Sequence, residues 1–350
     1  QAFEIAKERK YQLQETRAYL GLGKVYRLNN QLETAIKYYE QALAIAKERK
    51  DQLQETRAYL GLRDVYRLNN QLETAIKYYE QALEIAKERK DQLQETTAYL
   101  GLGDVYRLNN QLETAIKYYE QALEIAKERK DQDQETRAYL GLGYIYRLNK
   151  KFETAIKYYE QALEIAKERK DQLQETRAYL GLGGVYILNN QFETAIKYWE
   201  QALEIAKERK DQVGETTAYL GLGFVYRLNN QFETAIKYYE QALEIAKERK
   251  DRLQETRAYL GLGHVYRLNN QFETAIKYYE QALEIAKERK DQNQETTAYL
   301  RLGLVYRLNN QLETAIKYYE QALDIAKELE NKQKGNRARN AIEELSLRIA

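Results

Sequence analysis

The chain holds few residues of the kinds that most often act as metal ligands or catalytic bases. It has one histidine, His264, and no cysteine. Pairs of carboxylates are common, but a pair found in one forty-residue segment recurs in nearly all eight copies, as scaffold residues do. No GxxxxGK[ST] loop is present, and each GLG triplet lies inside an expected helix rather than between a strand and a helix. The sequence therefore predicts no enzyme, no metal site and no cofactor.

One position of the repeat changes in almost every copy, which indicates binding chemistry. It is the fourth residue of the motif that reads GLGKVY at Gly21, and we call it column 24 after its number in the first copy. We expect its residues to contact a ligand: Lys24, Asp64, Asp104, Tyr144, Gly184, Phe224, His264 and Leu304. Drift at an exposed position, or deliberate design of near-identical units, would also vary one column. However, other polar residues such as Glu33 and Lys37 do not vary between copies.

Two further columns, named in the same way, are rich in arginine. Column 17 holds Arg17, Arg57, Arg137, Arg177 and Arg257, with threonine in the other three copies. Column 27 holds Arg27, Arg67, Arg107, Arg147, Arg227, Arg267 and Arg307, with Ile187 in the remaining copy. Guanidinium groups bind carboxylates and phosphates, so these rows could hold an acidic ligand. Solvation, or pairing with nearby glutamates, is the other interpretation.

Composition limits the classes of partner. The 350 residues include 56 basic and 54 acidic side chains, so no strong overall field attracts nucleic acid or a membrane surface. No apolar run approaches the roughly 18 residues that a membrane span requires. No signal peptide is visible, and the lack of cysteine fits a reducing compartment. We therefore expect a cytoplasmic location.

Each forty-residue unit has the pattern of two helices. In residues 51–90, apolar residues recur at three- and four-residue spacing on both sides of an Asn-Asn pair, and no alternating strand pattern competes. Asp51 and Asn70 are each followed three residues later by Gln or Glu, which resembles a capping box. Asn69 suits a left-handed residue at the end of the first helix. Glycines inside each first helix imply that a neighbouring helix packs tightly there.

Positions that recur in all or nearly all copies of this unit resemble the tetratricopeptide repeat (TPR) pattern. They are Tyr19, Leu22, Gly23 and Tyr26 in the first helix, and Ala35, Tyr39 and Ala42 in the second. The unit departs from this pattern in two ways. Its period is forty residues rather than about 34, and it lacks the usual proline. Longer hairpins of this kind look like the TPRs of kinesin light chains and of bacterial signalling proteins. The resemblance implies an all-α fold, a right-handed superhelical α-solenoid of eight hairpins.

The ends of the chain depart from the repeat. Residues 1–10 align with the second half of a unit, so we expect the second helix of a truncated repeat, in a piece of a longer protein. Residues 11–330 hold the eight repeats. Residues 331–350 carry one apolar stripe, which fits a helix that caps the C-terminal end of the stack.

The variable and invariant columns lie on opposite sides of the first helix. Columns 13, 17, 21, 24 and 27 fall within one sector about 120° wide at 100° per residue, and Ala18, Tyr19, Leu22 and Tyr26 lie opposite. In the TPR family, first helices line a concave groove that contacts ligands. The resemblance therefore implies a groove with a variable row, two arginine rows and an apolar floor that includes Leu20 and Leu28.

These observations predict a non-enzymatic array that recognises a protein or an extended peptide in its concave groove. Acidic groups of the ligand should face Lys24, basic groups Asp64 and Asp104, and apolar groups the stretch from Tyr144 to Leu304, where Gly184 leaves a pocket. By analogy, the array looks like the sensor region of a larger signalling or defence protein of the NB-ARC type. Two alternatives remain. One is an inert or designed scaffold without a specific ligand. The other is RNA or another polyanion along the arginine rows, which the charge balance disfavours.

Overall fold

A computed structural model describes residues 2–329 and 331–349, and every regular element in these ranges is an α-helix. The first helices of the hairpins are α1 (Ala2–Leu28), α3 (Gln52–Leu68), α5 (Gln92–Leu108), α7 (Gln132–Leu148), α9 (Gln172–Leu188), α11 (Gln212–Leu228), α13 (Arg252–Leu268) and α15 (Gln292–Leu308). The second helices are α2 (Leu32–Glu48), α4 (Leu72–Glu88), α6 (Leu112–Glu128), α8 (Phe152–Glu168), α10 (Phe192–Glu208), α12 (Phe232–Glu248), α14 (Phe272–Glu288) and α16 (Leu312–Glu328). The last helix is α17 (Lys332–Ile349).

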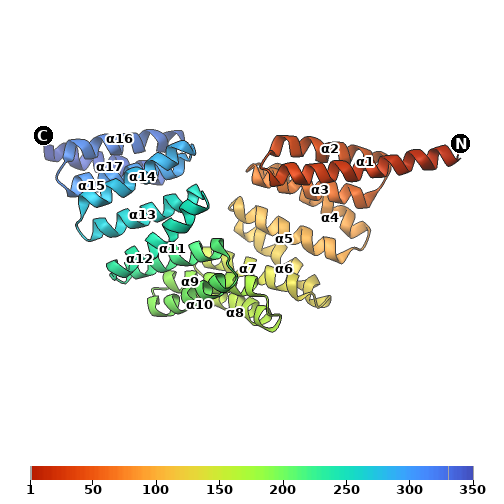
Figure 1. The fold of residues 1–350 in the computed structure, drawn as a ribbon, viewed down its shortest axis with the longest axis horizontal. Helices are drawn as coiled ribbons and strands as arrows, with labels where there is room; N and C mark the ends of the chain where they lie inside the picture. The colour runs from red at the N-terminus through yellow and green to blue at the C-terminus, as the bar shows by residue number, and fades with distance from the viewer. Residues whose placement is uncertain (1, 330, 350) are drawn as a thin grey trace. The chain divides into compact units, whose positions relative to one another are not determined.

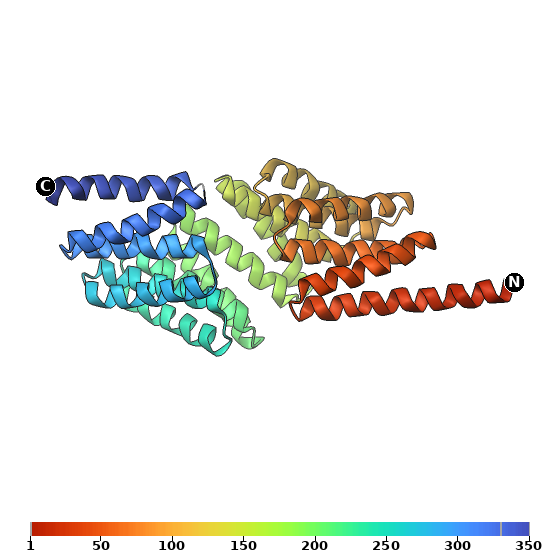
Figure 2. The ribbon, with the colours of Figure 1, turned by 90° about the horizontal axis from the view of Figure 1, so that it is seen from above.

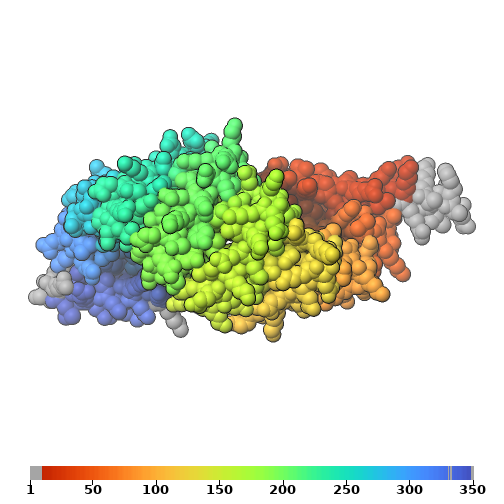
Figure 3. All heavy atoms as spheres, turned by 90° about the horizontal axis from the view of Figure 1, so that it is seen from below, coloured from red at the N-terminus to blue at the C-terminus, as the bar shows by residue number. Residues whose placement is uncertain are grey.

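The helices stack in chain order within two compact units. The first unit runs to Gly181 and the second begins at Leu182, so the division falls within α9. In the first unit consecutive helices from α1 to α8 pack against one another, and in the second unit consecutive helices from α10 to α17 do so (Figure 1). Side chains fill the space between neighbouring hairpins, which form adjacent bands in the space-filling view (Figure 3). The expected all-α solenoid of tandem hairpins is therefore confirmed.

The start of the chain differs from the expected second helix of a truncated repeat. Residues 2–10 are helical, but they continue without a turn into the first hairpin, so α1 is one long helix (Figure 2). At later boundaries, for example before α5, an aspartate begins the new helix after a left-handed lysine. Tyr11 occupies the aspartate position here and has no short acceptor to cap a new helix.

The turns between helices are of two kinds. An aspartate precedes each first helix from α3 on, and the carboxylate of Asp51, for example, accepts a 3.2 Å hydrogen bond from the Gln54 N–H. Within a hairpin the expected assignments are wrong by one residue. Asn69 has φ −81° and Asn70 is the left-handed residue, with φ 57°. The N-cap of α4 is then Gln71, whose side chain makes no capping hydrogen bond.

A tyrosine held between two glycines recurs in the core of the hairpins, at Tyr39, Tyr119, Tyr159 and Tyr239. The ring of Tyr119 lies against Gly103 of its own hairpin and Gly141 of the next one. A Cβ atom on Gly103 would lie 2.9 Å from this ring, and one on Gly141 would lie closer still. The glycines therefore let the backbones of the first helices approach a large aromatic side chain. This confirms the close packing expected from glycines inside helices.

First helices lie closer to one another than second helices do. The principal contacts between non-consecutive helices all join first helices, namely α1 with α3 and α5 with α7 in the first unit, and α11 with α13 and α13 with α15 in the second. First helices therefore form the inner side of each unit. At the C-terminal end, α17 packs on α16 and buries Ala338 and Leu345 fully. This is the expected capping helix.

Candidate recognition surface

Column 24 lies on the first helices, on the side that faces away from the buried core. In the first unit Lys24 is exposed, and Asp64, Asp104 and Tyr144 are half-buried. In the second unit Phe224 is 40% exposed, and His264 and Leu304 are half-buried. The neighbouring column 25 is fully buried in the interior repeats, for example at Val105 and Val225. One side of each first helix is thus packed, and column 24 reaches the accessible side.

Gly184 is the exception in this row. It is buried in the structure, so it presents little surface of its own to a ligand. The same repeat carries two further changes, because Ile187 replaces arginine in column 27 and Trp199 replaces the clamped tyrosine. The indole Nε1 of Trp199 is buried and has no hydrogen-bond partner among the described residues. The three changes occur together in one repeat, a signal that reading the columns one by one missed.

The two aspartates of column 24 have partners within the protein. The Asp104 carboxylate accepts a 2.6 Å hydrogen bond from the hydroxyl of Tyr119 and lies 3.6 Å from the Arg107 guanidinium. Burial and the Asp104 charge raise the pKa of Tyr119. The Asp64 carboxylate lies 3.9 Å from Nε of Arg63. Asp104 therefore supports the clamped tyrosine as well as facing the accessible side.

Arginines of column 27 stack on the aromatic residues of column 24. The Tyr144 ring lies between the guanidinium groups of Arg107 and Arg147, at 4.7 and 4.8 Å from its centre. The guanidinium of Arg227 lies 4.7 Å from the centre of the Phe224 ring. These cation–π contacts orient the arginines along the inner side.

Column 27 also borders the clamped tyrosines. Burial raises the pKa of Tyr159 to about 12, and the positive charge of Arg147 opposes this shift. Tyr239 and Arg227 show the same relationship. Arg227 is itself only 9% exposed, whereas the other arginines of this column are half-buried: Arg27, Arg67, Arg107, Arg147, Arg267 and Arg307. The arginines of column 27 therefore cover the core and are also partly accessible to solvent.

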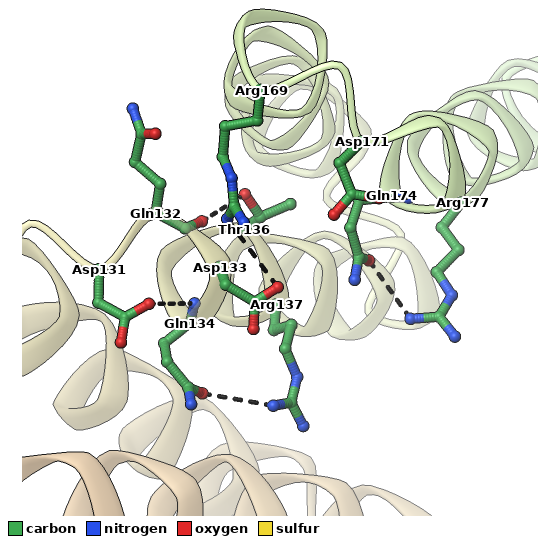
Figure 4. A network of polar contacts seen from close by, with 10 residues as sticks. All are labelled: Asp131, Gln132, Asp133, Gln134, Thr136, Arg137, Arg169, Asp171, Gln174 and Arg177. Carbon is green, nitrogen blue, oxygen red and sulfur yellow. Dashed lines mark hydrogen bonds and ion pairs between the residues drawn. The ribbon is translucent and has the colours of Figure 1, made fainter.

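The arginines of column 17 are all exposed and are held by their own helices. The Arg137 guanidinium donates to the Gln134 side chain at 3.4 Å, and Arg177 donates to Gln174 at 3.3 Å (Figure 4). Arg57 and Arg257 make the equivalent contact. Arg17 is exposed on α1. These weak pairs leave donors of each guanidinium facing solvent, where an acidic group could reach them.

The charge along column 24 differs between the units. The first unit carries Lys24, Asp64 and Asp104, and the second carries no acidic residue in this column. His264 is surrounded by arginines instead, and burial together with the charges of Arg227, Arg301 and Arg267 lowers its pKa to about 3. It is neutral at physiological pH. Within the described residues no group of three or more histidine, cysteine or acidic side chains is placed to bind a metal ion.

Together, the stacked helical hairpins and the accessible row on their inner helices define a helical repeat protein. The family model described as tetratricopeptide repeat matches residues 134–208, 214–288 and 254–328, and the one described as MalT-like TPR region matches residues 1–147. The chain belongs to the tetratricopeptide repeat family. No curated protein sequence matches it closely enough to count as a relative.

Solved structures share the fold at low identity. A STAND (Signal Transduction ATPase with Numerous Domains) protein with a tetratricopeptide repeat sensor from Pyrococcus horikoshii is 20% identical with a TM-score of 0.67, and the match covers 93% of this chain and 49% of that one. A Rap protein complexed with Competence and Sporulation Factor is 17% identical with a TM-score of 0.60, covering 96% and 98%. BtubC (BKLC) from P. vanneervenii is 23% identical with a TM-score of 0.56, covering 63% and 92%.

Repeats of this family typically bind partners rather than catalyse reactions. None of the helices in the described parts of the chain is both long and apolar enough to cross a membrane.

Proposed function

We propose that the inner side of each unit binds a protein or an extended peptide, and that column 24 sets which ligand is accepted. The observation that carries the proposal is the separation of faces. The residue that changes from repeat to repeat reaches the accessible side in every copy but that of Gly184, while its neighbour in column 25 is nearly constant and is buried from Val65 on. We also propose, from the lack of cysteine, that the protein works in the cytoplasm.

The spacing of the helices suits an extended peptide. Packed helices lie about 8–10 Å apart, and an extended chain advances about 3.3 Å per residue. Each repeat would then meet about every third residue of the ligand. In the first unit, an acidic group would approach Lys24 and a basic group Asp64, whose nearest cation is 3.9 Å away. Asp104 would contribute less, because Tyr119 already shares its carboxylate.

The similar structures support the proposal that this fold serves in binding. Their low sequence identity shows by itself only that the fold is shared. One of them is described as having a tetratricopeptide repeat sensor, and another is in complex with Competence and Sporulation Factor. By analogy, we propose that this chain is the sensor region of a signalling or defence protein.

The test exchanges charges within the row and leaves composition unchanged. Peptides would first be selected from a random displayed library against the full chain, and their binding then measured by calorimetry. The variant Lys24→Asp with Asp64→Lys should change the selected sequences and weaken binding of the original peptides about tenfold or more. The control, Glu73→Lys with Lys77→Glu on exposed positions of α4, should leave both unchanged. If the two variants selected the same peptides with the same affinity, or if the wild type enriched no peptide, the proposal that column 24 sets the accepted ligand would be refuted.

A further inference from the structure

A pocket of about 310 Å³ lies at the C-terminal end of the second unit, between α15 and the capping helix α17. Four cationic side chains line it, Arg301 and Arg307 from α15 and Lys334 and Arg337 from α17. The hydroxyl-bearing side chains Thr297 and Tyr319 also line it. No acidic side chain belongs to its lining. The pocket exists only where α17 covers the last repeat.

Two of the four cations are fixed by the protein. The Lys334 ammonium donates to the Asn293 carbonyl at 2.7 Å and to the Thr297 hydroxyl at 3.0 Å. The Arg307 guanidinium lies 3.2 Å from the Glu344 carboxylate. In the described part of the chain, neither Arg301 nor Arg337 has a carboxylate within ion-pair distance. Two guanidinium groups therefore share the pocket without a counter-ion among the described residues.

Arg301 is the unusual member of this set. Its column holds glycine in the other copies, where the clamped tyrosine needs the space. Arg301 lies beside the fully buried Tyr279, and burial lowers its pKa, as do the positive charges of Arg267, Arg227 and Arg337. A desolvated cation among like charges is costly unless an anion compensates it. The substitution thus adds positive charge to a region that already lacks acidic residues in column 24.

We propose that this pocket binds a phosphate group. A phosphate group presents several acceptor oxygens and carries up to two negative charges, so it can receive hydrogen bonds from Arg301, Arg337 and Lys334 together. A single carboxylate has two oxygens and one charge, and would leave part of the pocket's positive charge uncompensated. The three cations that would hold the phosphate lie outside columns 17, 24 and 27, and the pocket adjoins the C-terminal end of those columns, because Leu304 and Arg307 also line it.

The test measures the binding of pyrophosphate to the full chain by calorimetry in low-salt buffer. Arg301→Gly, which introduces the residue of the other repeats, and Arg337→Gln should each weaken binding about tenfold. Glu344→Gln removes the competing carboxylate beside Arg307 and should tighten binding. Lys317→Gln, at an exposed position of α16, removes one positive charge outside the pocket and should leave affinity unchanged. Circular dichroism checks that each variant is folded.

Further probes distinguish the source of the phosphate group. A hexapeptide whose only charged side chain is a phosphoserine, and the nucleotide ADP, each compete with pyrophosphate. The stronger competitor shows whether the site suits a modified protein or a nucleotide. Either outcome supports a phosphate site. Saturation by citrate at the same concentration as pyrophosphate would overturn the assignment in favour of a general anion site. The proposal also fails if the wild type shows no saturable binding up to about 10 mM, or if Arg301→Gly and Arg337→Gln bind as the wild type does.

Discussion

The hydroxyl of Tyr119 donates a 2.6 Å hydrogen bond to the carboxylate of Asp104. Tyr119 comes from the second helix of its hairpin and Asp104 from the first, and the tyrosine is only 2% exposed. Asp104, a residue of the variable column 24, therefore supplies the hydrogen-bond acceptor for Tyr119, a residue of the core. Changes in column 24 can act on stability as well as on binding.

Removal of the Asp104 carboxylate should destabilise the first unit. Asp104→Ala leaves the buried Tyr119 hydroxyl without its acceptor, and we expect the free energy of unfolding to fall by about 1–3 kcal/mol. Lys24→Ala is the control in the same column, since Lys24 is exposed, and it should cost less than about 1 kcal/mol. Urea unfolding followed by circular dichroism measures both. Equal costs would show that the tyrosine hydrogen bond contributes little.

Two glycines of the same column should respond in opposite directions to alanine. A Cβ atom at Gly141 would overlap the Tyr119 ring, so Gly141→Ala should lower the free energy of unfolding by roughly 1–3 kcal/mol. Gly21 has no atom within 4 Å of the added methyl, so Gly21→Ala should raise it by about 1 kcal/mol through helix propensity. Thermal melts of the two variants give the signs. Stabilisation by both would contradict the clamped-tyrosine packing.

Alkaline pH should destabilise the protein because the clamped tyrosines ionise more readily in the unfolded chain. Burial raises the pKa of Tyr159 and of Tyr239 to about 12. An unfolded tyrosine ionises near pH 10, so between pH 10 and 12 the unfolded chain has lost protons that the folded chain keeps. Stability is therefore fully present below pH 10 and falls above it, by on the order of 2 kcal/mol per tyrosine at pH 12.

The measurement for this prediction is urea unfolding as a function of pH, with tyrosinate absorbance at 295 nm. Tyr159→Phe has no proton to lose, so its stability should fall less steeply between pH 10 and 12 than that of the wild type. The same slope for both proteins would show that this ring does not stay protonated in the folded state.

Glycine at a left-handed position between repeats should stabilise the array. Lys90 has φ 53°, a conformation that costs a residue with a Cβ roughly 1–2 kcal/mol. Lys90→Gly removes this cost, and we expect a gain of about 0.5–1 kcal/mol after the greater freedom of glycine in the unfolded chain is counted. Glu84→Gly, at an exposed position inside α4, should lose about 1 kcal/mol. A loss at Lys90 as well would indicate that its side chain contributes more than its backbone costs.

Much of the fold follows from residues that are close together in the chain. The spacing of Ala58, Leu62 and Val65 marks a packed face, and all three are fully buried. The glycines within first helices predicted close packing, and Gly103 against Tyr119 shows it. Local pattern also misassigned the left-handed residue to Asn69 instead of Asn70, because both asparagines suit that conformation and only the helix ends decide between them.

The neighbours of column 24 were decided by tertiary packing. Periodicity assigns a residue to a face, but it does not say that Tyr119 reaches Asp104, that Arg107 and Arg147 enclose Tyr144, or that α17 closes a pocket over Arg301. These contacts join residues that are up to about forty positions apart or belong to different helices. Their energies depend on how far each side chain is buried and which charges surround it. Both the burial and the surrounding charges are set only when the hairpins stack. The variable column in the sequence therefore does not by itself give the hydrogen bonding and charge of the surface.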